Sequence, residues 1–114
     1  MRLPTKFDYA KLASQCSDLP IKVGAVLVDH GKVLRLGHNT LGRGTPGTWT
    51  RHAEFRATMN IDARGRDLYV YRQNQLTGLP AMAKPCANCR EVIATLGVRK
   101  VFYTVPGGYA VEKL

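Results

Sequence analysis

Apolar residues near the start of the chain recur at the spacing of an amphipathic helix. They fall at positions i, i+3, i+4 and i+7, and they are Tyr9, Leu12, Ala13 and Cys16. This pattern predicts a helix over residues 5–16 with these side chains on its buried face. The segment Thr5-Lys6-Phe7-Asp8 has the form of a capping box, with aspartate in place of the usual glutamate. Cys16 is then interpreted as a small buried residue rather than a metal ligand.

Two apolar runs joined by a short turn follow this helix. Residues 23–28 are continuously apolar, as expected of a buried strand, and residues 32–37 form the return strand. Asp29-His30-Gly31 between them predicts a hairpin turn in which His30 is exposed. Residues 38–51 are polar and rich in glycine, which indicates a loop. Because long loops in compact domains usually carry function, we expect this segment to contribute to a site.

Helical and strand patterns alternate in the second half of the chain. They predict a helix over 52–61, a strand over 68–71, a helix over 86–96 capped by Gly97, and a strand over 100–104. A helix that connects two strands of one sheet implies that those strands are parallel. Only about four residues separate the last strand from the β-prone run after it, whereas a parallel crossover needs about a dozen. The tail is therefore expected to return as an antiparallel hairpin.

Composition adds bounds to this α/β pattern. The chain has 114 residues, of which 45% are hydrophobic and 22% charged, as expected of one globular domain over residues 1–114. No apolar run approaches the roughly 20 residues of a membrane span, and the N-terminus lacks the apolar core of a signal peptide. Three cysteines argue against a disulfide framework. We therefore expect a cytoplasmic protein without a membrane partner.

The charge balance points to a kind of partner. Lysine and arginine number 17 against 8 aspartates and glutamates, which gives a net charge of +9. Such a basic domain is typical of proteins that meet phosphate-bearing partners, although a solvated basic surface is the alternative. The net charge does not indicate which nucleobase, if any, such a partner carries.

Two cysteines and a histidine have the spacing of a metal site. Cys86 and Cys89 stand at the predicted start of a helix, just after Pro85, which suits a helix start. Residues three apart share a helix face, so both thiolates can reach one zinc ion at about 2.3 Å each. The helix N-terminus also favours the ionised thiols. His52 is the third candidate ligand, and Glu54 lies two residues beyond it, where it is better placed to handle protons than to bind metal.

The number of protein ligands distinguishes a catalytic zinc site from a structural one. A structural site needs a fourth protein ligand, and the one other cysteine, Cys16, lies far upstream. His52, Cys86 and Cys89 leave one coordination position for water, which zinc activates near neutral pH. The sequence therefore favours Zn²⁺ as a catalytic cofactor.

These two motifs together resemble the zinc-dependent cytidine deaminase superfamily. His52-Ala53-Glu54 matches its His-x-Glu motif, and Pro85-Cys86-Ala87-Asn88-Cys89 matches its Pro-Cys-x-x-Cys motif, in the expected order. Val23-Gly24-Ala25-Val26 is also similar to its first strand. The resemblance implies a three-layer sandwich, with a mixed five-stranded sheet between helices on both faces and a C-terminal β-hairpin. It also implies hydrolytic deamination of cytosine to uracil.

The resemblance further implies roles for individual residues. Glu54 is expected to transfer protons as the catalytic residue, and the backbone of Ala53 to donate to the base carbonyl. Asn39 matches a position that hydrogen-bonds the substrate sugar, or else it simply ends its strand. Trp49 either stacks on a base beside the pocket or packs in the core. Tyr103 either lines the pocket or belongs to the core.

The sequence leaves the substrate open between a polymer and a monomer. The charge, Trp49 and the loop arginines Arg43 and Arg51 slightly favour a cytosine-containing nucleic acid, either single-stranded DNA or RNA. The short hairpin tail resembles the branch that acts on free cytidine, so free cytidine, deoxycytidine or (d)CMP is the alternative. A non-catalytic zinc-containing module that binds nucleic acid is an alternative from another class, and it needs a fourth ligand. The resembled branch is commonly oligomeric, which makes a homo-oligomer a further expectation.

Overall fold

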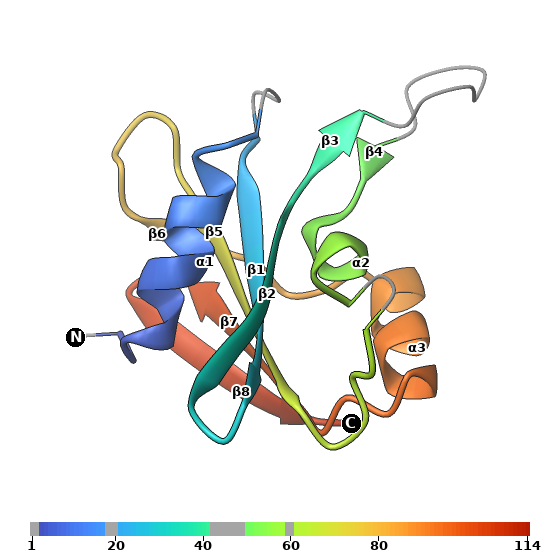
Figure 1. Cartoon of the computed structure of the whole chain (residues 1–114). Helices are drawn as coiled ribbons and strands as arrows, with labels where there is room; N and C mark the ends of the chain where they lie inside the picture. Colours follow the sequence, from blue (N-terminus) through green and yellow to red (C-terminus); the bar gives the residue numbers. More distant parts are fainter. Residues whose placement is uncertain (1–2, 18–20, 42–49, 59–60) are drawn as a thin grey trace.

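A mixed sheet with helices on both faces forms the protein. Figure 1 shows the computed structural model, which describes residues 3–17, 21–41, 50–58 and 61–114. In chain order the elements are α1 (Lys6–Ser14), β1 (Val23–Asp29), β2 (Lys32–His38), β3 (Thr40–Leu41), β4 (Thr50–Arg51), α2 (Ala53–Thr58), β5 (Asp67–Gln73), β6 (Pro80–Ala81), α3 (Ala87–Thr95), β7 (Lys100–Val105) and β8 (Gly108–Lys113). None of the described helices is long and apolar enough to cross a membrane.

Five strands follow one another across the sheet in the order β2-β1-β5-β7-β8, and the short β6 pairs with β5. β5 and β7 are parallel, with α3 between them in sequence, as the helix between two strands predicted. β8 returns antiparallel to β7 and confirms the predicted C-terminal hairpin. The predicted five-stranded mixed sheet is therefore confirmed, with β6 as an addition.

Alternating side chains supply a separate core on each face of the sheet. Ala25 and Leu27 of β1 face the layer formed by α2 and α3, where Ala53, Ala57 and Ile93 are buried. On the other face, Val26 and Val28 pack under α1, together with Phe7, Ala10 and Tyr71. Figure 1 shows α2 and α3 beside one another and α1 across the sheet from them. This is the three-layer arrangement that the resemblance implied.

Local signals were reliable at two turns. His30 and Gly31 have φ angles of 48° and 80°, which is the geometry of a tight two-residue hairpin turn, and His30 is exposed as predicted. Gly97 has a φ of 84°, and its N–H donates to the carbonyl of Ala94. The N–H of Val98 donates to Ile93, so α3 ends in a Schellman motif around the predicted glycine.

The predicted buried face of the first helix is wrong. Tyr9 and Leu12 are 43% and 59% exposed, and Cys16 is also exposed. The buried residues of α1 are instead Phe7, Ala10, Ala13 and Ser14. The reason lies in β1, where a Cβ placed on Gly24 would collide with the carbonyl oxygen of Ala10 and lie 2.5 Å from the backbone nitrogen of Ser14. The helix therefore approaches the strand so closely that small side chains must face it.

Two further expectations need correction. Thr5 is the N-cap of α1, but its side chain makes no capping hydrogen bond, and its backbone is helical rather than extended, so the capping box is absent. The predicted loop 38–51 has strand pairing at its two ends, where β3 pairs with β4. Residues 42–49 of that loop, which include Arg43 and Trp49, lie outside the described residues.

Candidate active site

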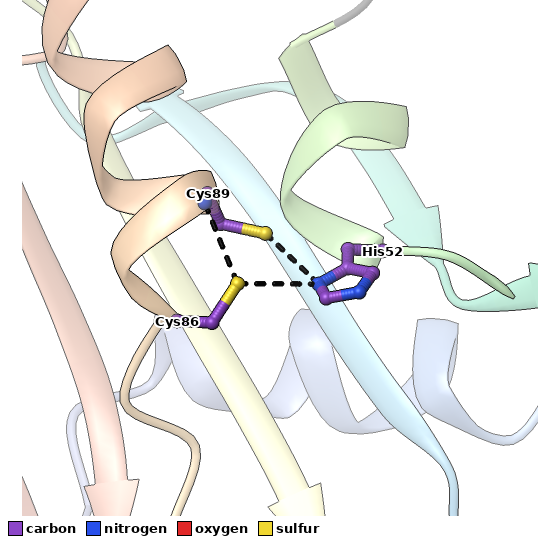
Figure 2. A group of neighbouring side chains, drawn as sticks. All are labelled: His52, Cys86 and Cys89. Atoms are coloured by element: carbon purple, nitrogen blue, oxygen red, sulfur yellow. Dashed lines mark hydrogen bonds between the residues drawn. The ribbon is translucent and has the colours of Figure 1, made fainter. Parts of the chain in front are cut away.

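Three side chains from two helix starts meet at one point (Figure 2). His52 immediately precedes α2, Cys86 is the N-cap of α3, and Cys89 lies in the first turn of α3. The Sγ atoms of Cys89 and Cys86 lie 2.9 and 3.9 Å from Nδ1 of His52. The three ligand atoms all lie within 4.8 Å of one another. The predicted ligands are therefore brought together by the fold.

Local helix geometry sets the spacing of the two thiols. Cys86 has the extended backbone of an N-cap residue, with φ −64° and ψ 162°. The N–H of Cys89 donates to the Sγ of Cys86 over 3.4 Å. This bond uses one of the N–H groups that a helix start leaves without an internal partner.

The donor set fits zinc. Two sulfurs and one imidazole nitrogen are ligands that zinc prefers, and a catalytic zinc site uses three protein ligands. Cys89 is buried, and that burial raises the pKa of its thiol, with the nearby Glu54 as the next cause. A divalent cation would offset both effects, because a thiol that coordinates such an ion is deprotonated. Within the described part of the chain, no fourth histidine, cysteine or acidic residue joins this group.

Glu54 lies in the first turn of α2 beside the metal ligands. Its side chain is buried, with 5% of the residue exposed. Burial raises the pKa of the Glu54 carboxyl, while its own backbone N–H and the charge of His52 act in the opposite direction. A buried carboxyl with a raised pKa is suited to accepting and returning a proton near neutral pH.

A cavity of about 410 Å³ opens onto these residues. It is lined by His52, Ala53, Glu54 and Cys86 together with seven residues from other segments, which are Ile21, Val23, Asn39, Arg72, Met82, Ala83 and Lys84. Ala53, Glu54, Asn39 and Ala83 are buried, whereas Ile21, Met82 and Lys84 are exposed. The cavity thus has a metal end, where Glu54 is buried but the ligand Cys86 is exposed, and an open end at Met82 and Lys84.

Asn39 lines the cavity and also holds its wall together. Its Nδ2 donates to the carbonyl of Ile21 over 2.7 Å, and its Oδ1 accepts from the N–H of Val23 over 2.9 Å. An amide side chain has two N–H donors, so one donor of Asn39 is left for another partner. Both readings of this residue, as a strand-ending and as a substrate-binding residue, fit its position.

The other residues singled out in the sequence lie in different places. Ala53 is fully buried and lines the cavity. Tyr103 is 7% exposed within the core cluster and is not among the described residues that line the cavity. Trp49 lies outside the described residues, so its expected stacking role stays a prediction.

Sequence reasoning missed Arg72 and Lys84 as residues of the site. Arg72 is near the carboxyl end of β5, a strand that is parallel to β7. Ligands of open α/β sheets bind beyond the carboxyl ends of parallel strands, and that rule could have found it. Lys84 stands directly before Pro85 and Cys86, so its closeness to the metal motif was also a signal.

Comparisons with known proteins agree with this geometry. The family model described as the cytidine and deoxycytidylate deaminase zinc-binding region matches residues 6–105. A search of curated proteins found no significant match.

Solved structures are similar to this chain over most of its length. Cytidine deaminase from Burkholderia pseudomallei has a TM-score of 0.74 and 25% identity, covering 99% of this chain and 93% of that chain. The dCMP deaminase of the cyanophage S-TIM5 in its apo form has a TM-score of 0.65 and 29% identity, covering 90% and 84%. The same enzyme in complex with dCMP and dUMP has a TM-score of 0.62 and 28% identity, covering 90% and 82%.

Proposed function

Because this chain belongs to the cytidine and deoxycytidylate deaminase zinc-binding family, we propose that it deaminates cytosine to uracil in a free nucleoside or nucleotide. It is a hydrolase of this family with a His52-Cys86-Cys89 zinc site. The observation that carries the proposal is that Glu54 and two of the metal ligands, His52 and Cys86, line one cavity. That cavity falls within the range of about 300–1,000 Å³ that is usual for small-molecule sites.

The residues of the chain divide the chemistry among them. Bound zinc supplies Lewis-acid activation of water. The Glu54 carboxylate takes a proton from the attacking water, delivers it to the ring nitrogen of cytosine, and then assists the departure of ammonia. Water and cytosine are thereby converted to uracil and ammonia. The burial of Glu54 excludes bulk water from these proton transfers.

Two neighbouring residues orient the substrate. Ala53 is the first residue of α2, and the first N–H groups of a helix have no partner within it. The Ala53 N–H is therefore suited to donate to the carbonyl oxygen of the base. The remaining N–H of Asn39 is suited to a sugar hydroxyl, since Asn39 lines the same cavity.

The similar structures support a monomeric substrate rather than a polymer. One is a cytidine deaminase, and another is a dCMP deaminase in complex with dCMP and dUMP. The antiparallel β7–β8 hairpin also favours this alternative, which the sequence had left open against single-stranded DNA or RNA. The non-catalytic zinc module is disfavoured, because the described residues supply three ligands and no fourth.

Ammonia release from a panel of substrates tests the proposal. The zinc-loaded chain is incubated with cytidine, deoxycytidine, CMP, dCMP and a cytosine-containing single-stranded oligonucleotide. Glu54→Gln is expected to lower the rate by about 10²–10⁴-fold, as for loss of a general acid–base, while zinc content is retained. Glu91→Gln, an exposed glutamate on α3, is the matched control and should leave the rate unchanged. Conversion of the oligonucleotide with none of the monomers would refute the monomeric substrate.

A further inference from the structure

Two cations line the wall of the zinc cavity and have no part in holding the metal. Arg72 is half-buried near the end of β5, and Lys84 is exposed in the segment between β6 and α3. Both share the cavity with His52 and Glu54. The chemistry assigned so far to Glu54, Ala53 and Asn39 uses neither of them.

No described carboxylate neutralises these two cations. Four other arginines of the described chain form ion pairs, which are Arg64–Asp62, Arg66–Asp29, Arg90–Glu112 and Arg99–Asp67. Arg72 and Lys84 have no such pair with any described acidic residue, and Glu54 is the one acid among the described residues that line the cavity. The Nη1 of Arg72 donates to the carbonyl of Met82 over 3.5 Å, which leaves its other donors for a ligand. The open part of the cavity therefore carries positive charge.

The sheet holds Arg72 in position. Its backbone pairs with Val23 of β1 on one side and with Ala81 of β6 on the other. Its N–H donates to the hydroxyl of Thr104 over 3.2 Å. Lys84 is followed by Pro85, which is buried and directly precedes the metal ligand Cys86. Arg72 is therefore carried by a rigid element, which is the condition for a site that discriminates between ligands.

We propose that Arg72 and Lys84 bind the phosphate of a cytosine nucleoside monophosphate and so make the chain prefer the nucleotide over the nucleoside. The inference rests on the proposed function and names its substrate class. A phosphate monoester carries a charge of about −1.5 to −2 at neutral pH and offers several acceptor oxygens. The planar fork of arginine and the ammonium of lysine complement such a group. A phosphate monoester carries more negative charge than a phosphodiester, which has a single negative charge. A pair of cations therefore suits the monoester better.

Relative deamination of dCMP and deoxycytidine tests the assignment. We compare kcat/KM for both substrates in the zinc-loaded wild-type chain, Arg72→Gln, Lys84→Gln and the double variant. The preference for dCMP should fall by about tenfold to a hundredfold in each single variant, because each loses a hydrogen bond to a charged group. Arg35→Gln on β2 and Lys32→Gln at the hairpin remove the same charge outside the cavity and should leave the preference unchanged.

A binding measurement separates this inference from the proposed function. Calorimetric titration of dCMP into zinc-loaded Glu54→Gln should show weaker binding once Arg72→Gln is added to that background. Equal use of dCMP and deoxycytidine by the wild type, or an equal loss of preference in the Arg35 and Lys32 controls, would overturn the phosphate assignment and leave the proposed function standing. Preferred conversion of a cytosine-containing oligonucleotide that depends on Arg72 would assign the cations to a polymer instead. Binding of dCMP that depends on Arg72, without ammonia release from any substrate, would support the phosphate assignment and refute the proposed function.

Discussion

The two ends of the cavity are built in different ways. At the metal end, His52 immediately precedes α2, and Cys86 and Cys89 stand at the start of α3, where helix geometry sets the spacing of the two thiols. At the open end, Arg72 comes from a strand end and is half-buried, while Lys84 comes from a connecting segment and is exposed. The reaction is therefore expected to depend on the metal end. Under the proposed phosphate assignment, the choice among substrates depends on side chains at the open end, and changing them is expected to leave the metal in place.

Removal of a metal ligand should disrupt the metal end with the largest effect. In Cys89→Ser, zinc affinity should fall by at least about a hundredfold. Loss of a residue that only hydrogen-bonds to a metal ligand already lowers metal affinity by about 10–100-fold, and loss of a ligand itself should cost at least as much. Activity should be lost with the metal. Zinc content after gel filtration, read by elemental analysis, checks this, and circular dichroism reports whether the fold is kept.

Cys16→Ser provides the matched control for that variant. Cys16 is exposed and does not belong to the ligand group, so this variant should keep its zinc and its activity. Full zinc content in Cys89→Ser would contradict the assignment of this residue as a ligand.

A methyl group added under α2 should disturb the same end less severely. A Cβ on Gly37 of β2 would lie 2.5 Å from the backbone nitrogen of Ala57 and 2.7 Å from the carbonyl oxygen of Ala53. Gly37→Ala should push α2 from the sheet, destabilise the fold by about 1–3 kcal/mol as overpacking does, and weaken zinc binding by displacing His52. Urea unfolding and zinc titration measure the two effects.

Gly24→Ala is the matched control for Gly37→Ala. The added Cβ would meet α1 on the opposite face of the sheet, so the fold should be destabilised while zinc affinity is unchanged. Equal loss of zinc affinity in both variants would show that the metal site responds to general destabilisation and not to the position of α2.

The smallest effect is expected at the open end. Met82 is 48% exposed, and Met82→Ala should change the free energy of unfolding by no more than about 0.5 kcal/mol. KM should rise by at most about fivefold, because a half-exposed side chain buries little apolar surface. Zinc content should stay at the wild-type level, and a variant that lost zinc here would erase the distinction between the two ends.

Much of the site could be predicted from the sequence because its residues lie close together within two short motifs. Cys86 and Cys89 lie three apart at a helix start, and Glu54 follows His52 by two residues, so each half of the site depends on local backbone geometry. The hairpin at His30-Gly31 and the cap at Gly97 were found for the same reason, since a backbone with positive φ favours these residue types.

The buried face of the first helix could not be predicted from local spacing. Two apolar stripes fit the same stretch of sequence, one through Tyr9 and Leu12 and the other through Phe7 and Ala10. Periodicity carries no information about which stripe meets the sheet. The missing side chain of Gly24, a residue from another element, selects the stripe with the smaller residues.

From the sequence alone came the ligand types, the predicted proton-transfer residue and the order of the main strands and helices, because these follow from spacing along one segment. Two features emerged only from the three-dimensional fold: the buried face of α1, and the cavity that Arg72 and Lys84 share with Glu54. Packing and charge act between residues that lie far apart in the chain. Their distances are set by the whole sheet and not by any local pattern.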